Sequence, residues 1–110
     1  MKAIEKYVQA MENKDYNGLA ELFDKDGTII DYCPNGTSQR EYHVYGKEAI
    51  NMFFRNKFMF GKCSISEAEV VNDTQAEFVI NYTGFYVMAI ATVRRVSENG
   101  LIERLTVRPK

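Results

Sequence analysis

Apolar residues near the start of the chain recur with the period of an α-helix. Four of them have the spacing i, i+3, i+4 and i+7: Ile4, Tyr7, Val8 and Met11. This spacing predicts an amphipathic helix over about residues 2–13. Asp15 then stands where an N-cap would begin a second, shorter helix, whose inner face would end at Phe23. Two helices are therefore expected before the first strand.

The middle of the chain predicts a strand, a loop and a third helix. The segment TIIDY at 28–32 is typical of a strand. The following CPNGTSQREY, at 33–42, is rich in turn-forming and polar residues, which indicates a loop or a loose hairpin. After a short strand, HVYG, the segment GKEAINMFFRNKF at 46–58 places its apolar residues on one side of a helix.

From Lys62 onward the pattern becomes that of β-strands. Four runs are rich in β-forming residues, and turn signals ND, TG and SENG separate them: KCSISEAEVV, TQAEFVINYT, FYVMAIATVRRV and LIERLTVRPK. Helices followed by a meander of long antiparallel strands predict an α+β fold, with the helices on one face of the sheet. No linker or repeat interrupts the sequence, so residues 1–110 are expected to form a single domain.

The strand predicted at 85–93 is apolar on both of its faces. One set of alternate positions points one way, and the other set, Tyr86, Met88, Ile90 and Thr92, points the opposite way. A one-sided antiparallel sheet normally alternates apolar with polar residues. The helices are expected to cover one face of the sheet. A second copy of the chain is expected to cover the other face, which predicts a homodimer. The alternative is a sheet that curls strongly over itself.

Composition narrows the classes of function. The chain has 110 residues, 45% of them hydrophobic, and a formal net charge of −1. It has no continuous basic stripe, so nucleic acid is not an expected partner. No segment approaches the roughly 18 apolar residues of a membrane span, and the charged N-terminal segment does not resemble a signal peptide. A cytoplasmic protein is expected, in which Cys33 and Cys63 are reduced unless the fold brings them together.

The order of these elements resembles a known fold. The chain is similar to the nuclear transport factor two-like, or cystatin-like, superfamily. The similarity lies in the order of two helices, LFDKDGTIIDY, a loop, GKEAINMFF and four strands ending in LIERL. Its fold is a cone-shaped α+β roll, with N-terminal helices packed on a curved, mainly antiparallel sheet. The segment KYVQAMENKDYNGLAELFDKDGTIID most resembles ketosteroid isomerase and the SnoaL-like polyketide cyclases. The resemblance spans nearly the whole chain.

The resemblance implies roles for two residues. Asp31 takes the position of the general base of ketosteroid isomerase, which is a standard example of carboxylate tuning, and Tyr7 takes that of the oxyanion donor. The chain departs from the pattern at the second, protonated acid, because the aligned position holds Thr92 or Val93. The aromatic residue that supports the tyrosine falls at Phe54, which lacks a hydroxyl. Half of the expected oxyanion machinery is therefore missing.

Each candidate residue also has an ordinary structural explanation. Asp31 is either a desolvated base in the pocket or a residue that caps the following turn. Tyr7 either donates to a ligand oxygen or is a core tyrosine bonded to the backbone. His43, the only histidine, is a second proton carrier or a half-exposed strand residue with no chemical role. Thr92 offers a weak hydroxyl donor or merely packs.

The remaining candidates form an apolar lining for a flat or flexible ligand. These are Phe54, Phe58, Tyr86 and Met88, with Thr92 and His43 as the polar positions. No cluster has the spacing of a metal site and no glycine-rich loop follows a strand, so neither metal nor cofactor is expected. Three functions stay open. They are an isomerase or cyclase that moves a proton next to a carbonyl, a binding module for a small apolar or aromatic ligand, and a dimerisation module without pocket chemistry.

Overall fold

The computed structural model describes residues 1–32 and 40–110, so Cys33 and most of the predicted loop lie outside the described residues. In the part described, the chain forms three helices and six strands. The helices are α1 (Ala3–Glu12), α2 (Tyr16–Glu21) and α3 (Lys47–Met59). The strands are β1 (Phe23–Asp31), β2 (Tyr42–Tyr45), β3 (Cys63–Val70), β4 (Gln75–Tyr82), β5 (Phe85–Val96) and β6 (Ile102–Pro109).

A side-chain carboxylate accepts from an open amide group at the start of each of the first two helices. The backbone amide of Lys2 donates to Glu5 Oε1 over 2.9 Å at the start of α1. Asp15 Oδ1 accepts from the backbone amide of Gly18 over 2.9 Å at the start of α2. The prediction for Phe23 is wrong, because α2 ends earlier and Phe23 opens β1 as a fully buried residue.

The six strands form one sheet in the order β2-β1-β6-β5-β4-β3. Strands β3 to β6 form the predicted antiparallel meander, and β2 pairs antiparallel with β1. Only the β1–β6 pair is parallel among the described strands. The predicted α+β roll is confirmed.

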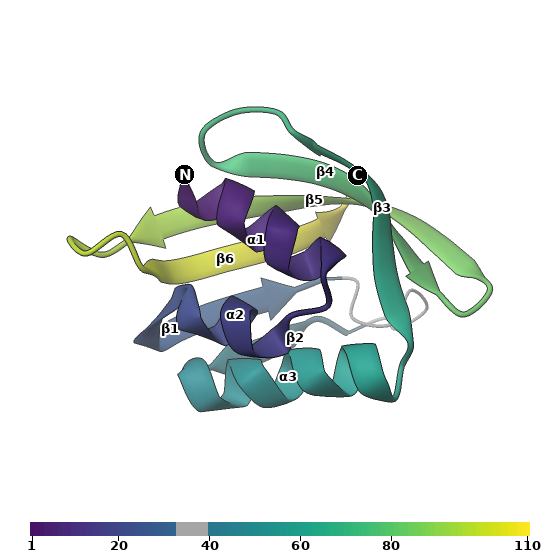
Figure 1. Cartoon of the computed structure of the whole chain (residues 1–110), viewed down its shortest axis with the longest axis horizontal. Helices are drawn as coiled ribbons and strands as arrows, with labels where there is room; N and C mark the ends of the chain where they lie inside the picture. The colour runs from purple at the N-terminus through teal and green to yellow at the C-terminus, as the bar shows by residue number, and fades with distance from the viewer. Residues whose placement is uncertain (33–39) are drawn as a thin grey trace.

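All three helices lie on the same face of the curved sheet (Figure 1). In the view of Figure 1, α1 crosses in front of β5 and β6, whereas α2 and α3 lie in front of β1 and β2. The core fills the space between the two layers. Its largest fully buried side chains are Tyr7, Phe23, Phe78, Ile4, Leu19, Ile29, Ile50, Ile102, Leu105 and Cys63.

The opposite face of the sheet carries the second set of β5 side chains. Ala89 and Ala91 point into the core and are fully buried, so the residues between and before them point outward. Tyr86 and Met88 are accordingly 72% and 52% exposed. Among the residues that the structure describes, no helix has the length and apolar character needed to cross a membrane.

Candidate ligand pocket

An internal pocket lies between α1, α3 and the helix-covered face of the sheet. Eleven residues line it: Tyr7, Met11, Ile29, Asp31, Phe53, Phe54, Lys57, Cys63, Phe78, Ile80 and Val107. Most of these side chains are apolar. Its free volume is about 10 Å³, roughly the space of one water molecule.

Asp31 enters the pocket because of the alternation of β1. Ile29 and Asp31 point toward the helices, whereas Ile30 lies between them and points to the opposite face. Asp31 stands beside Val107 of β6, another residue of the lining. The residue is only 3% exposed, so its carboxyl group is a buried polar group that requires partners.

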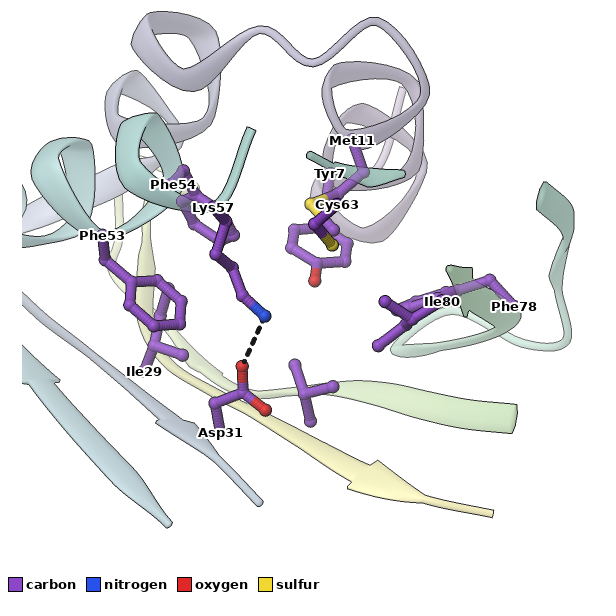
Figure 2. Close-up of a pocket in the computed structure, with 11 residues that line it drawn as sticks. Tyr7, Met11, Ile29, Asp31, Phe53, Phe54, Lys57, Cys63, Phe78 and Ile80 are labelled. Carbon is purple, nitrogen blue, oxygen red and sulfur yellow. Dashed lines mark hydrogen bonds and ion pairs between the residues drawn. The ribbon is translucent and has the colours of Figure 1, made fainter. Parts of the chain in front are cut away.

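One of these partners is Lys57 of α3. Its Nζ lies 3.3 Å from Asp31 Oδ2, and the two side chains are 11% and 4% exposed. Figure 2 shows the Lys57 side chain reaching from the helix toward Asp31 across the pocket. Lys57 also donates to the Tyr82 hydroxyl over 3.2 Å. The pocket therefore contains a buried ion pair joined to a phenol at the end of β4.

Aromatic rings surround the amine of Lys57. Its Nζ lies 5.3 Å from the centre of the Phe53 ring and 5.0 Å from that of Tyr82. At such distances the negative ring face attracts a cation. Lys57 also lies in the last turn of α3, where the helix dipole favours positive charge. The Lys57 amine is thus held by a carboxylate and two aromatic rings in a mainly apolar setting.

Tyr7 brings a second hydroxyl to the pocket, from α1. The residue is 1% exposed, and its ring packs 6.3 Å from that of Phe78. In Figure 2 its hydroxyl points into the space that Lys57 and Asp31 also face. The nearby Cys63 is a buried thiol, and burial raises its pKa. At neutral pH the thiol is therefore protonated and a poor nucleophile.

The predicted residues fall into two groups according to the side of the sheet on which they lie. Asp31, Tyr7 and Phe54 line the pocket. Phe58 is buried in the core, where its ring stacks with that of Phe54 at 5.9 Å, but it is not part of the lining. Three of the eight predicted site residues thus line the pocket, and a fourth, Phe58, lies on the same side of the sheet.

Tyr86, Met88 and Thr92 lie on the opposite face of the sheet. Because Ala91 and Val93 point to the helices, Thr92 must point away from them. Its hydroxyl accepts from Gln75 Nε2 over 3.2 Å. Thr92 therefore cannot replace the missing acid, and Tyr86 and Met88 do not contribute to the pocket wall.

His43 also lies outside the pocket. It pairs with Ile30 across β1 and β2, so it shares the outer face. Its Nε2 lies 3.6 Å from Glu41 Oε1 and its Nδ1 lies 3.4 Å from the Tyr45 hydroxyl, both at the surface. In this arrangement His43 is not a proton carrier for the pocket.

Sequence reasoning missed Lys57 and Tyr82. A signal for Lys57 was present, because it occupies the apolar stripe of α3, four residues after Phe53 and three after Phe54. A lysine at such a position must either extend to solvent or find a buried partner. Tyr82 has the parity of Phe78 and Ile80 on β4, which places its ring on the pocket side of the sheet.

Comparison with known proteins identifies the family. A family model of the nuclear transport factor 2 (NTF2) domain matches residues 1–104. The chain belongs to this family. No curated protein gives a significant sequence match to this NTF2 domain.

Solved structures similar to this NTF2 domain have the same fold at low sequence identity. A protein from Sphaerobacter thermophilus is 20% identical, with a TM-score of 0.70, over 98% of this chain and 93% of its own. A Catenulispora acidiphila protein with a ketosteroid isomerase-like fold was solved in complex with trimethylamine. It is 20% identical, with a TM-score of 0.64, and the match covers 96% of this chain and 83% of that protein's chain. RV0760c from Mycobacterium tuberculosis was solved in complex with estradiol-17beta-hemisuccinate. It is 18% identical, with a TM-score of 0.68, and the match covers 98% of this chain and 91% of the RV0760c chain. The resemblance to the ketosteroid isomerase fold is thereby confirmed.

Proposed function

We propose that this NTF2 domain binds a small, mainly apolar molecule with a polar oxygen in the pocket between α1, α3 and the sheet. The observation that carries this proposal is the Lys57–Asp31 pair, which faces a pocket whose other walls are mostly apolar. A buried ion pair often adds little stability compared with apolar side chains. Its presence in a pocket therefore favours a role in orienting a ligand.

Relatives with bound molecules support the part of the proposal that assigns small-molecule binding to this fold. The fold of RV0760c holds estradiol-17beta-hemisuccinate, a molecule with an apolar ring system and polar ends. The Catenulispora acidiphila protein holds the much smaller trimethylamine. The same architecture thus accommodates ligands of different size, and the side chains of each pocket decide which ligand fits.

A ligand larger than water has to displace side chains of this pocket. Phe53 is the residue best placed to move, because it is only partly buried, unlike its neighbour Phe54. Its ring makes edge contacts with Tyr42 at 6.2 Å and with Phe54 at 5.2 Å. We expect the Phe53 ring to turn outward when the pocket is occupied.

Titration with a panel of neutral apolar ketones and phenols, followed by amide NMR, tests this proposal. We expect shifts to concentrate at residues around Asp31 and Lys57. Val107→Phe should abolish binding, because the larger ring fills the small free volume, at a stability cost of about 1–3 kcal/mol. Met88→Ala, on the outer face, is the matched control and should bind normally. Equal binding by the Val107→Phe protein would place the ligand elsewhere.

A second candidate is catalysis of proton transfer next to a carbonyl, as in an isomerase or cyclase. It is favoured by the placement of the Asp31 carboxylate and the Tyr7 hydroxyl on one pocket. Asp31 would remove the proton, and Tyr7 would donate a hydrogen bond to the enolate oxygen. The binding module without turnover is the alternative.

Deuterium exchange at the α-carbon of a bound ketone separates these two functions. For the enzyme, Asp31→Asn should reduce exchange by about 10²- to 10⁴-fold, the usual contribution of a positioned base. Tyr7→Phe should cost less, because it removes one donor only. If ketones bind and yet exchange no faster than with the Asp31→Asn protein, the pocket is a receptor.

We also propose that the protein is a homodimer joined through the outer face of the sheet. This face presents the exposed Tyr86 and Met88, and an apolar surface of this kind is stabilised when a second copy covers it.

A further inference from the structure

Lys57 supplies a positive charge to a pocket whose sequence pattern suggested only a carboxylate and a phenol. The ammonium group carries three N–H donors. Its distance to Asp31 Oδ2, 3.3 Å, is longer than the roughly 2.7–2.9 Å of a strong charge-assisted bond. An incoming oxygen atom can accept from this ammonium group in place of Asp31 Oδ2 or together with it. Lys57 is therefore placed to contact a ligand as well as Asp31.

Charge balance restricts the kind of ligand that the pocket accepts. Among the described lining residues, Asp31 and Lys57 are the only side chains that carry a full charge at neutral pH, and their charges are opposite. An anionic or cationic ligand would leave one buried charge without a counter-charge, which is costly. A neutral ligand avoids this cost.

The balance is also kept when a proton moves from a neutral ligand to Asp31. The carboxylate becomes a carboxylic acid, and the ligand oxygen gains the negative charge that Asp31 has lost. Lys57 can then pair with that oxygen, so that the pocket again contains one anion and one cation. A low-dielectric site stabilises such a product only if the cation is already in place.

We propose that Lys57 is the partner of this developing oxyanion, and that the pocket takes enolisable carbonyl compounds and acidic phenols. For a carbonyl compound, the α C–H bond breaks and its proton passes to Asp31. The electron pair of that bond forms the C=C bond, and the carbonyl oxygen becomes an enolate oxygen held by Lys57. For a phenol, the O–H proton passes to Asp31 directly. This inference rests on the proposed ligand pocket and names its ligand class.

In this proposal Lys57 takes over the function of the missing second acid. Thr92, at the aligned position, points to the other face of the sheet and cannot reach the pocket. Lys57 provides a donor from α3 instead, together with a full positive charge. Removing one donor from an oxyanion site typically costs 10²- to 10³-fold in rate, as an order of magnitude.

The test uses 4-nitrophenol, whose ionised and neutral forms absorb at different wavelengths. Asp31→Asn imitates the protonated base and leaves Lys57 as the cation of the pocket. In this protein we expect bound 4-nitrophenol to be mainly ionised, near the pH at which the free compound is half ionised. In Asp31→Asn/Lys57→Met, which removes both charges, the ratio of ionised to neutral bound compound should be at least about tenfold lower.

Lys47→Met in the Asp31→Asn background is the matched control. Lys47 lies on the same helix but pairs with the exposed Glu21 at 2.8 Å, outside the pocket, so its removal should leave the ratio unchanged. Amide NMR spectra verify that each variant is folded. An equal ratio with and without Lys57 would overturn the role of Lys57 while leaving the pocket proposal intact. Absence of 4-nitrophenol binding by every variant and by the parent protein would overturn both.

Discussion

Lys57 and Asp31 show how a single buried pair couples stability with recognition. Each side chain is expensive to bury alone, and each is tolerated because the other is 3.3 Å away. The Tyr82 hydroxyl, 3.2 Å from Lys57, adds a neutral partner. Substitution of one member of the pair therefore lowers the stability of the protein by more than the loss of one contact, because the other member remains as a buried charge without its partner.

We predict that Lys57→Met destabilises the protein by about 3 kcal/mol, since Asp31 then remains buried without its cation. Adding Asp31→Asn should recover much of this loss, because the second substitution removes the stranded charge. Urea unfolding of the two single variants and the double variant measures the coupling.

The exposed pair Lys47–Glu21 is the control for this cycle. Its 2.8 Å distance is shorter than that of the pocket pair, but Glu21 is 71% exposed. Lys47→Met should therefore cost less than about 1 kcal/mol. Equal losses for Lys47→Met and Lys57→Met would mean that the pocket pair is effectively solvated.

Residue types alone predicted only part of this site. Asp31 and Tyr7 were found because they match a known pattern at the correct separation, and both line the pocket. Lys57 belongs to no such pattern, and its partner is 26 residues away in the sequence. Which ionisable groups meet in a core depends on how helix and strand are rotated against each other, and local spacing does not specify that rotation.

Among the elements, α3 has the largest influence on the pocket. It supplies Phe53, Phe54 and Lys57, three of the lining residues, from consecutive turns of one face. Gly46 immediately precedes the helix with φ of 91°, a conformation that favours glycine, and its amide donates to the Gly27 carbonyl over 2.7 Å. This junction fixes where α3 starts relative to β1, and hence which helical turn faces Asp31.

Element types and their order followed from the sequence more completely than the site did. The four strands after residue 62 and the helix before them have strong periodic patterns, and each appears within a residue or two of its expected bounds. The exception is β1, which begins at Phe23 rather than near residue 28. Its register shift between Phe23 and Thr28 breaks the alternation, so local periodicity did not reveal the first half of the strand.

The whole molecule has two unlike faces, one covered by helices (Figure 1) and one on which Tyr86 and Met88 are exposed although Val79 and Thr92 are buried. The β5 pattern predicted cover on both faces, by the helices on one and by a second copy of the chain on the other, because both sets of alternate side chains are apolar. On the outer face, Tyr86 lies across from Asn81 of β4 and Met88 lies across from the buried Val79.

We predict that the protein sediments as a dimer at concentrations well above the micromolar range, and that Met88→Glu converts it to a monomer by placing a charge in the interface. Met52→Glu is the control. Met52 is 61% exposed on α3, close to the 52% of Met88, but lies on the helical side. A parent protein that sediments as a monomer under these conditions would contradict the dimer.

The parallel pairing of β1 with β6 has a consequence for the time course of folding. Ile29 is opposite Leu105, more than 70 residues later in the chain. Contacts between such distant segments form late, because a long loop must close before they contribute any stabilisation. During synthesis, β1 and its pocket residues cannot pair with β6 until the ribosome has made β6. Val107 of β6, which lines the pocket, is then in place. Until then β1 is paired with β2 alone, and the edge that β6 covers stays open, so the nascent chain carries an unpaired strand edge that favours aggregation.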